Sequence, residues 1–273
     1  PVFDYKRCLF EKVYVETPVD TDGDGRLDLI AVYIRRPLET TQGMRVPAIY
    51  VANPYMLECN EDWYVPHDVD RDVSPYPQQH ITESDITFDP STVSFPQPRY
   101  PRATIGYADT APTEEIPLDC ISDWYSYFNS RGYASVFCGG LGTRGSQGFN
   151  CCGSPEETAA FKAVIDWLNG RCRAFTNLTD NIEIRADWCT GKVAMSGKSY
   201  LGTMCIAVAS TGVEGLETII PEAAISNWYD YYRCNGLNLP AIGWQGDDLD
   251  ILAKYCFSRA KDPEDYASVR EAY

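Results

Sequence analysis

The chain of 273 residues has only two histidines, and its eleven cysteines form no Cys-x-x-Cys pair, so the ligand spacing of a zinc site is missing. Basic residues are also scarce: 23 lysines and arginines stand against 39 aspartates and glutamates, which gives a formal net charge of −16. A nucleic-acid backbone is held by an excess of basic side chains. We therefore expect no nucleic acid as a partner.

No apolar run is long enough for a transmembrane helix, and the first residues contain no hydrophobic signal core, so no membrane association is expected. The first residue is Pro rather than Met, which suggests a piece cut from a longer chain. Several cysteines, such as Cys138 and Cys205, lie in apolar runs where a free thiol packs as a small hydrophobic side chain. The sequence thus favours a reducing, cytoplasmic compartment; a secreted, disulfide-bonded chain is the alternative.

Short runs of β-branched, aromatic or apolar residues alternate along the chain with segments of helical character. The predicted strands are 10–17, 27–34, 46–52, 133–138, 192–195 and 218–220. Helices are predicted to end at residue 129 and to span 154–169 and 199–210. This order indicates an α/β fold: a mostly parallel sheet with helices on both faces, preceded by antiparallel N-terminal strands.

Two turn regions carry specific signals. Asp20, Asp22 and Asp24 alternate with other residues and glycine in the turn between the first two strands, as in the start of a calcium loop. However, Ala31 stands where a bidentate Glu should close such a loop, so we expect a structural turn, with calcium binding as the alternative.

Ser154 is predicted to cap the helix over 154–169, with the Glu157 side chain reaching back to the Ser154 amide.

Residues 56–118 lose periodicity and gather Pro, Asp and Tyr, which indicates a long irregular insertion. The expected organisation is a core over 1–232 that contains this insertion, followed by the start of a helical cap or insertion over 233–273. His67 and His80 lie in the insertion, and neither is assigned a role.

The most informative stretch is Gly197-Lys198-Ser199-Tyr200-Leu201-Gly202, where a predicted strand gives way to a helix. This is the setting of a nucleophile elbow, in which a tight turn exposes a serine hydroxyl and the helix N-terminus favours developing negative charge. The usual pattern has Gly two residues after the Ser; here Leu201 fills that place and Gly202 follows it. The alternative is a serine that caps an ordinary helix.

Several blocks in register resemble the Xaa-Pro dipeptidyl-peptidases, cytoplasmic serine peptidases with an α/β-hydrolase domain related to cocaine esterase. The matching blocks are 22–25 with 28–30, 53–55, 164–170, 197–203 and 220–232. The Gly202 spacing is also similar to that of the family. The resemblance implies that the chain is a fragment of the catalytic domain, with an α/β-hydrolase sheet that is incomplete at its C-terminal end.

Carried onto this sequence, the resemblance implies that Ser199 is the nucleophile. The backbone N–H of Tyr200 and the phenol of Tyr55 would form the oxyanion hole; a phenol is a donor that remains neutral at pH 7. No metal or organic cofactor is implied.

The same resemblance implies that Trp228 forms an aromatic wall for a substrate proline, with Tyr229 and Tyr231 beside it. Asp247 would bind the free α-amine of the substrate and so fix the cut after the second residue. The family usually has Glu-Asp where this chain has Asp247-Asp248, so the reach of this carboxylate is one methylene shorter.

No histidine follows Ser199, although in this fold the base is a histidine placed after the serine. We therefore expect the Asp and His of the triad outside this chain, and the isolated chain to be inactive. The expected partners are proline-containing peptides with a free N-terminus, and a homodimer is left open. The rival functions are an esterase or amidase of the cocaine-esterase type and a non-catalytic calcium-binding or interaction module.

Overall fold

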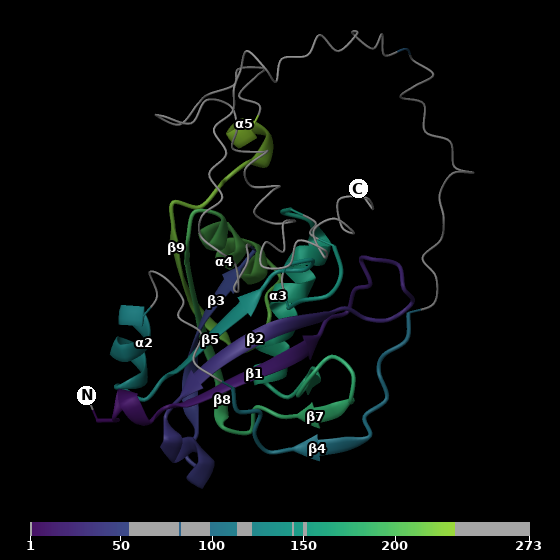
Figure 1. Cartoon of the computed structure of the whole chain (residues 1–273). Helices are drawn as coiled ribbons and strands as arrows, with labels where there is room; N and C mark the ends of the chain where they lie inside the picture. Colours follow the sequence, from purple (N-terminus) through teal and green to yellow (C-terminus); the bar gives the residue numbers. More distant parts are fainter. Residues whose placement is uncertain are drawn as a thin grey trace, which may run out of the picture.

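The computed structural model describes residues 2–54, 82, 99–113, 122–143, 145–149 and 152–232 (Figure 1). Tyr55, His67, His80, Asp247 and the expected cap over 233–273 lie outside these residues.

The described residues form a nine-stranded sheet in the order β4-β7-β6-β1-β2-β5-β3-β8-β9. The strands are β1 (Leu9–Glu16), β2 (Leu29–Arg36), β3 (Val46–Asn53), β4 (Gly106–Ala108), β5 (Ala134–Gly139), β6 (Ala174–Phe175), β7 (Ile182–Ile184), β8 (Cys189–Lys198) and β9 (Leu216–Glu222). The helices are the 3-10 turns η1 (Tyr5–Arg7) and η2 (Leu38–Gln42) and the α-helices α2 (Ser122–Asn129), α3 (Pro155–Leu168), α4 (Tyr200–Ser210) and α5 (Trp228–Tyr232).

The two halves of the sheet differ in direction. Strands β5, β3, β8 and β9 are parallel neighbours, whereas β1 pairs antiparallel with β2 and β6, and β2 pairs antiparallel with β5. The expected parallel core with antiparallel N-terminal strands is therefore present. The sequence did not predict the short strands β6 and β7, nor β4, which pairs with β7 from within the 56–118 stretch.

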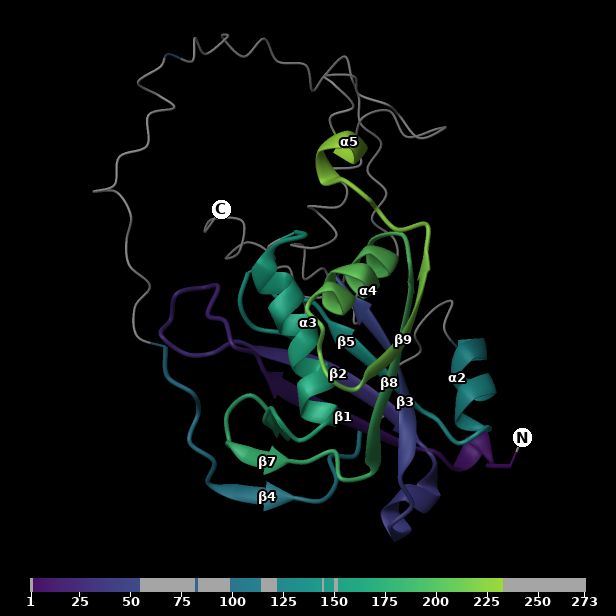
Figure 2. The same cartoon turned by 180° about the vertical axis from the view of Figure 1, so that it is seen from behind.

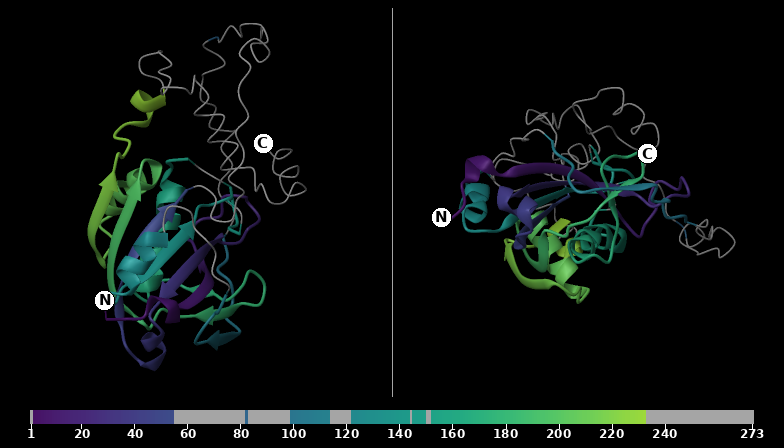
Figure 3. Two further views of the ribbon diagram at one scale, coloured as in Figure 1. Left: turned by 60° about the vertical axis from the view of Figure 1, so that its left-hand side comes forward. Right: turned by 90° about the horizontal axis from the view of Figure 1, so that it is seen from below.

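Helices α3 and α4 cover one face of the sheet, in front of the strands in Figure 2, and α2 lies on the other face (Figure 3). Side chains on one strand alternate between the two faces. On β3, Tyr50 joins the large core beneath α3 and α4, whereas Val51 joins a small cluster with Ala31, Tyr33 and Phe137. Within the described residues, no helix is both long and apolar enough to cross a membrane.

The start of α3 is partly as predicted. The Ser154 hydroxyl accepts the Glu157 N–H at 3.1 Å, and Pro155 opens the helix. The predicted return of the Glu157 side chain to the Ser154 amide is wrong: its Oε2 accepts the N–H of Gly153 at 2.8 Å instead. The reason is a second donor to the same oxygen, the Tyr200 hydroxyl, which itself lies 2.8 Å from the Gly153 nitrogen and holds the carboxylate next to that N–H.

Candidate active site

Ser199 is the single residue between β8 and α4, and its backbone is strained. Its φ of 60° and ψ of −123° lie in a region that non-glycine residues adopt only at a cost of about 1–3 kcal/mol. The side chain is exposed and makes no capping hydrogen bond to α4. A helix-capping serine has extended backbone angles and a bonded hydroxyl, so Ser199 is not an ordinary cap. The geometry is that of a nucleophile elbow.

Two glycines allow α4 to start so close to β8 and β9. A Cβ on Gly197 would lie 2.5 Å from the Leu201 carbonyl carbon, and a Cβ on Gly202 would lie 2.6 Å from the Glu222 carbonyl oxygen. Both obstacles are backbone atoms, so any side chain would push the helix off the sheet. Leu201, where the usual pattern has Gly, packs against the small cluster that includes Tyr33. The sheet therefore accommodates Leu201, and the close approach to β9 falls on Gly202.

Hydrogen bonds hold the turn in this conformation. The Ser199 N–H donates to the Glu222 carbonyl at 2.8 Å, which ties the elbow to β9. The Ser199 carbonyl accepts the Thr203 N–H at 2.9 Å and its hydroxyl at 3.1 Å. The Thr203 hydroxyl in turn accepts the Ile225 N–H at 2.8 Å. The strained residue is thus fixed on both sides by backbone contacts and leaves its own hydroxyl exposed.

Tyr200 and Trp228, both expected at the site, are brought together. Their rings lie edge to face with centroids 5.0 Å apart. Trp228 also packs on Gly153, where a Cβ would come within 2.6 Å of the indole. Tyr229 and Tyr231 follow Trp228 on α5 and are exposed. The structure therefore joins Trp228 to the residue that follows Ser199.

Glu157 contacts the Tyr200 side chain, and the sequence did not reveal this contact. It is buried, and its Oε2 accepts the Tyr200 hydroxyl at 2.6 Å. Burial raises the pKa of Glu157 to about 7, against the lowering effect of the bonds from Tyr200 and Gly153. The sequence shows this residue only as part of a capping box, and nothing in it connects position 157 with position 200.

Tyr55 lies outside the described residues, but the strand before it is described. β3 is the parallel neighbour of β8, with Tyr50 paired to Met195, so the two strands end at the same edge of the sheet. The N–H of Gly140 donates to the Asn53 carbonyl at 2.8 Å and fixes the end of β3. Asp247 cannot be placed in the same way, because no described strand leads into it.

The acidic turn differs from the calcium loop considered above. Carboxylate oxygens of Asp20, Asp22 and Asp28 lie within 4.8 Å of one another; Asp24 is not part of this group, and its carboxylate accepts the Arg26 N–H at 2.7 Å. Both oxygens of Asp20 accept backbone N–H groups of the same turn. Burial raises the pKa of Asp28 to about 6, and the repulsion from the neighbouring aspartates adds to this.

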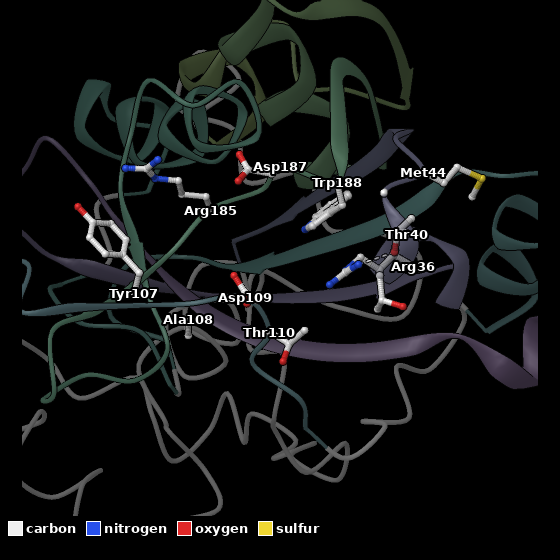
Figure 4. Close-up of a pocket in the computed structure, with 12 residues that line it drawn as sticks. Arg36, Thr40, Met44, Tyr107, Ala108, Asp109, Thr110, Arg185, Asp187 and Trp188 are labelled. Carbon is white, nitrogen blue, oxygen red and sulfur yellow. Dashed lines mark hydrogen bonds between the residues drawn. The ribbon is translucent and has the colours of Figure 1, made fainter.

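Two cavities lie at the opposite end of the parallel strands from Ser199. One, of about 480 Å³, is surrounded by Arg36 at the end of β2, by Asp109, and by Arg185 and Trp188 before β8 (Figure 4). The Arg36 guanidinium is already paired with the buried Glu11 at 2.6 Å. The other, of about 550 Å³, lies beside it at the end of α3. Neither cavity includes a residue of the elbow.

A mixed sheet with a strained, exposed serine between a parallel strand and a helix defines the α/β-hydrolase class. Within that class, the family model "X-Pro dipeptidyl-peptidase (S15 family)" matches residues 22–273. The chain therefore belongs to this family, and the resemblance read from the sequence is confirmed.

Curated relatives are similar along the whole chain. An Xaa-Pro dipeptidyl-peptidase of Pediococcus pentosaceus is 45% identical over 271 residues, 98% of this chain and 33% of its own length. One of Lactobacillus helveticus is 43% identical over 273 residues, 100% of this chain and 33% of its own length. The chain thus spans about a third of the length of the curated relatives it matches.

Among solved structures, a CocE/NonD family hydrolase from Staphylococcus aureus matches 99% of this chain and 41% of its own, with a TM-score of 0.49 and 15% identity. An α-amino acid ester hydrolase matches 85% of this chain and 31% of its own, with a TM-score of 0.43 and 18% identity.

Proposed function

We propose that the gene product containing this chain is a serine peptidase that releases Xaa-Pro dipeptides from the free N-terminus of peptides through an acyl-enzyme on Ser199. The observation that carries the proposal is the backbone of Ser199, strained at φ 60° and with an exposed hydroxyl that caps no helix. Strain of this kind persists where the surrounding structure enforces it, and it concentrates at active sites. The relatives that are similar along the whole chain are named Xaa-Pro dipeptidyl-peptidases, which supports this activity.

The reaction is acyl transfer. The Ser199 oxygen attacks the carbonyl carbon of the second substrate residue, a proline, and its proton passes to a histidine base and then to the leaving amine. The acyl-enzyme is hydrolysed by water, which releases the dipeptide and restores the serine. The carbonyl oxygen, negatively charged in each tetrahedral intermediate, takes hydrogen bonds from the Tyr200 N–H and the Tyr55 phenol.

The charge that develops on this oxygen lies at the N-terminus of α4, where Tyr200 is the first residue. First-turn N–H groups stand outside the hydrogen-bond ladder of a helix, and the helix dipole adds to the stabilisation of an anion there. Because no histidine follows Ser199 in the sequence, the base and its Asp partner belong to another part of the gene product. The isolated chain is therefore proposed to be inactive.

Substrate selection rests on three elements. Trp228 offers a flat apolar surface to the pyrrolidine ring, and both groups lose little conformational entropy on contact. Tyr229 and Tyr231, which follow it in α5, are exposed and are proposed to extend the aromatic surface. Asp247 binds the α-ammonium group, which limits the product to a dipeptide. Proline-containing peptides with a free N-terminus are thus the proposed partners.

A rate comparison in a gene product long enough to supply the triad Asp and His tests the proposal. Wild type is expected to cleave Gly-Pro-anilide and to lose at least a hundredfold in kcat/KM when the glycine is N-acetylated, because an acetylated amine carries no charge for Asp247. Ser199→Ala is expected to abolish both activities. Equal rates on free and acetylated substrate would favour the esterase or amidase alternative.

Three further expectations become proposals here. The core over 1–232, with its 56–118 insertion, and a helical cap starting in 233–273 are the proposed units. A reducing compartment, the cytoplasm, is proposed because the six cysteines within the described residues are all free thiols. A homodimer is the third proposal, and size-exclusion chromatography with light scattering measures the oligomeric state directly.

A further inference from the structure

Three hydrogen bonds join Glu157, Tyr200 and Gly153 next to the elbow at Ser199. The Tyr200 hydroxyl donates to Glu157 Oε2 at 2.6 Å. The Gly153 N–H donates to this same Oε2 and to the Tyr200 hydroxyl oxygen, both at 2.8 Å. The three groups come from α4, from the first turn of α3 and from the loop before α3. One carboxylate oxygen therefore joins the start of α3 to the start of α4, 43 positions further along the chain.

These bonds act on the elements that the proposed reaction uses. Tyr200 follows Ser199 directly, and its ring is nearly fully buried, so its side-chain position determines how its peptide group is oriented. Trp228 contacts the Tyr200 ring on one side and the Gly153 backbone on another. A shift of the Tyr200 hydroxyl would move both the N–H proposed for the oxyanion and the wall proposed for the substrate proline.

The titratable groups that face Glu157 are Tyr200 on α4, Cys152 in the loop and Cys138 on β5. Burial raises the pKa of all three, that of Cys138 to about 12, so they stay neutral near pH 7. Burial also raises the pKa of Glu157 to about 7. The second oxygen of Glu157, Oε1, is buried and makes no hydrogen bond within the described part of the chain. Among these four groups, Glu157 alone changes charge near neutral pH.

We propose that Glu157 is a positioning residue of the Ser199 site: by accepting the Tyr200 hydroxyl, it fixes the peptide group that stabilises the oxyanion and the aromatic wall at Trp228. This inference rests on the proposed function. Misplacing a catalytic group by about 1 Å can cost about 100-fold in rate. Ionised Glu157 also places a negative charge behind the site where the oxyanion forms, so its deprotonation opposes the reaction.

The test uses a complete gene product and variants of neighbouring residues. Glu157→Gln keeps an acceptor oxygen and removes the charge, so we expect at least half of the wild-type kcat/KM at pH 6.5. Because the substrate α-amine loses its proton near pH 8 with either enzyme, both should decline between pH 7 and 8.5, and wild type should decline severalfold more than the variant. Glu157→Ala leaves the Tyr200 hydroxyl without this acceptor; it should lower kcat about 100-fold and, because the wall at Trp228 shifts with Tyr200, also raise KM. Glu156→Gln, which removes the same charge from the exposed neighbouring position, is the control and should match wild type at every pH.

Two outcomes overturn the inference. The first is a folded Glu157→Ala variant with wild-type kcat and pH profile. The second, decisive if Glu157→Ala does not fold, is a Glu157→Gln variant whose kcat/KM declines with rising pH in the same way as that of wild type.

Failure of the proposed function would look different, because wild type itself would then release no Xaa-Pro dipeptide. In that case the rate at which a fluorophosphonate labels Ser199, measured across pH, tests the role of Glu157 without any peptide substrate.

Discussion

Two tight turns at the same edge of the sheet both require a residue with positive φ, and they place different residue types at that position. The strand directions place the end of β1 and the end of β8 on one side, so the acidic turn after β1 and the elbow after β8 face the same way. In the acidic turn, left-handed backbone angles fall on Gly23 and Gly25, with φ of 74° and 85°. In the elbow, the positive φ falls on Ser199.

The side chains follow the same contrast. The aspartates of the first turn accept backbone N–H groups of their own loop, and Asp28 accepts both the N–H and the hydroxyl of Thr21, at 2.8 and 2.7 Å. Ser199 is exposed, and its hydroxyl caps no helix. A turn that stores no strain and uses its polar groups internally is a structural device. A turn that puts a non-glycine residue under strain and leaves its hydroxyl exposed is available for chemistry.

The largest effect that sharpens this comparison is expected from Gly202→Ala. The added methyl group would lie 2.6 Å from the Glu222 carbonyl oxygen, so α4 must move away from β9 and take the elbow with it. We expect a loss of about 2 kcal/mol in the free energy of unfolding, from urea denaturation, and at least a tenfold loss in kcat of the complete gene product.

Gly106→Ala on β4 is the matched control, because its methyl group would meet only the end of the Ile182 side chain, at 3.0 Å. It should change stability by less than about 1 kcal/mol and leave kcat unchanged. Wild-type kcat in the Gly202→Ala variant would show that the elbow does not depend on this close approach.

The glycine spacing also shows how far the sequence could predict the site. The strand, the helix and the serine between them could be inferred from residues 193–203, because local propensity and the tight turn act within one short segment. The reason why glycine stands at position 202 rather than 201 could not be inferred from this segment. It depends on β9, a separate segment whose carbonyl approaches the helix, and on the cluster at Tyr33 that receives Leu201.

A smaller effect is expected at Asp28, the buried member of the acidic turn. Burial raises its pKa to about 6, above its ordinary value, so the fold favours the protonated form. The stability that Asp28 contributes is therefore present at low pH and is lost as pH rises through 6. Between pH 5 and pH 7.5 this loss amounts to about 1.4 kcal/mol.

Asp28→Asn should remove this dependence, so the difference in unfolding free energy between wild type and the variant should change by about 1.4 kcal/mol between pH 5 and pH 7.5. Asp24→Asn, which removes an exposed carboxylate of the same turn, is the control and should leave the pH dependence as in wild type. If the difference in unfolding free energy between wild type and Asp28→Asn stayed constant with pH, burial would not destabilise the ionised form of Asp28.

Ser199→Gly tests the strain in the elbow directly. Glycine adopts φ near 60° without steric cost, so the variant should gain about 1 kcal/mol in the free energy of unfolding while losing activity. Ser210→Gly, in the last turn of α4, has no strain to relieve and should lose about 0.5 kcal/mol. Loss of stability in both variants would show that the backbone of Ser199 stores no strain.

Glu157 shows a second limit of the sequence. The rule that pairs a capping serine with a glutamate three residues later correctly predicted the Ser154 cap, because that contact is local. It gave the wrong partner for the glutamate side chain, because the Tyr200 hydroxyl arrives from a helix 43 positions further on. Tertiary contacts of this kind, and not the local motif, decide the partner of the glutamate side chain.

The smallest expected effect is that of calcium on the acidic turn. Calcium takes six to eight oxygen ligands in proteins, and both oxygens of Asp20 already accept the N–H groups of Gly23 and Gly25, at 2.8 and 3.0 Å. An ion would have to compete with these bonds, and an oxygen of Asp24 is likewise taken by the Arg26 N–H. Isothermal calorimetry is therefore expected to show no binding tighter than about 1 mM, at the weak limit of known calcium modules. Micromolar binding that Asp28→Asn abolishes would break the comparison, because the acidic turn would then be a ligand site and the elbow would no longer be the one turn of the two with a polar group left for chemistry.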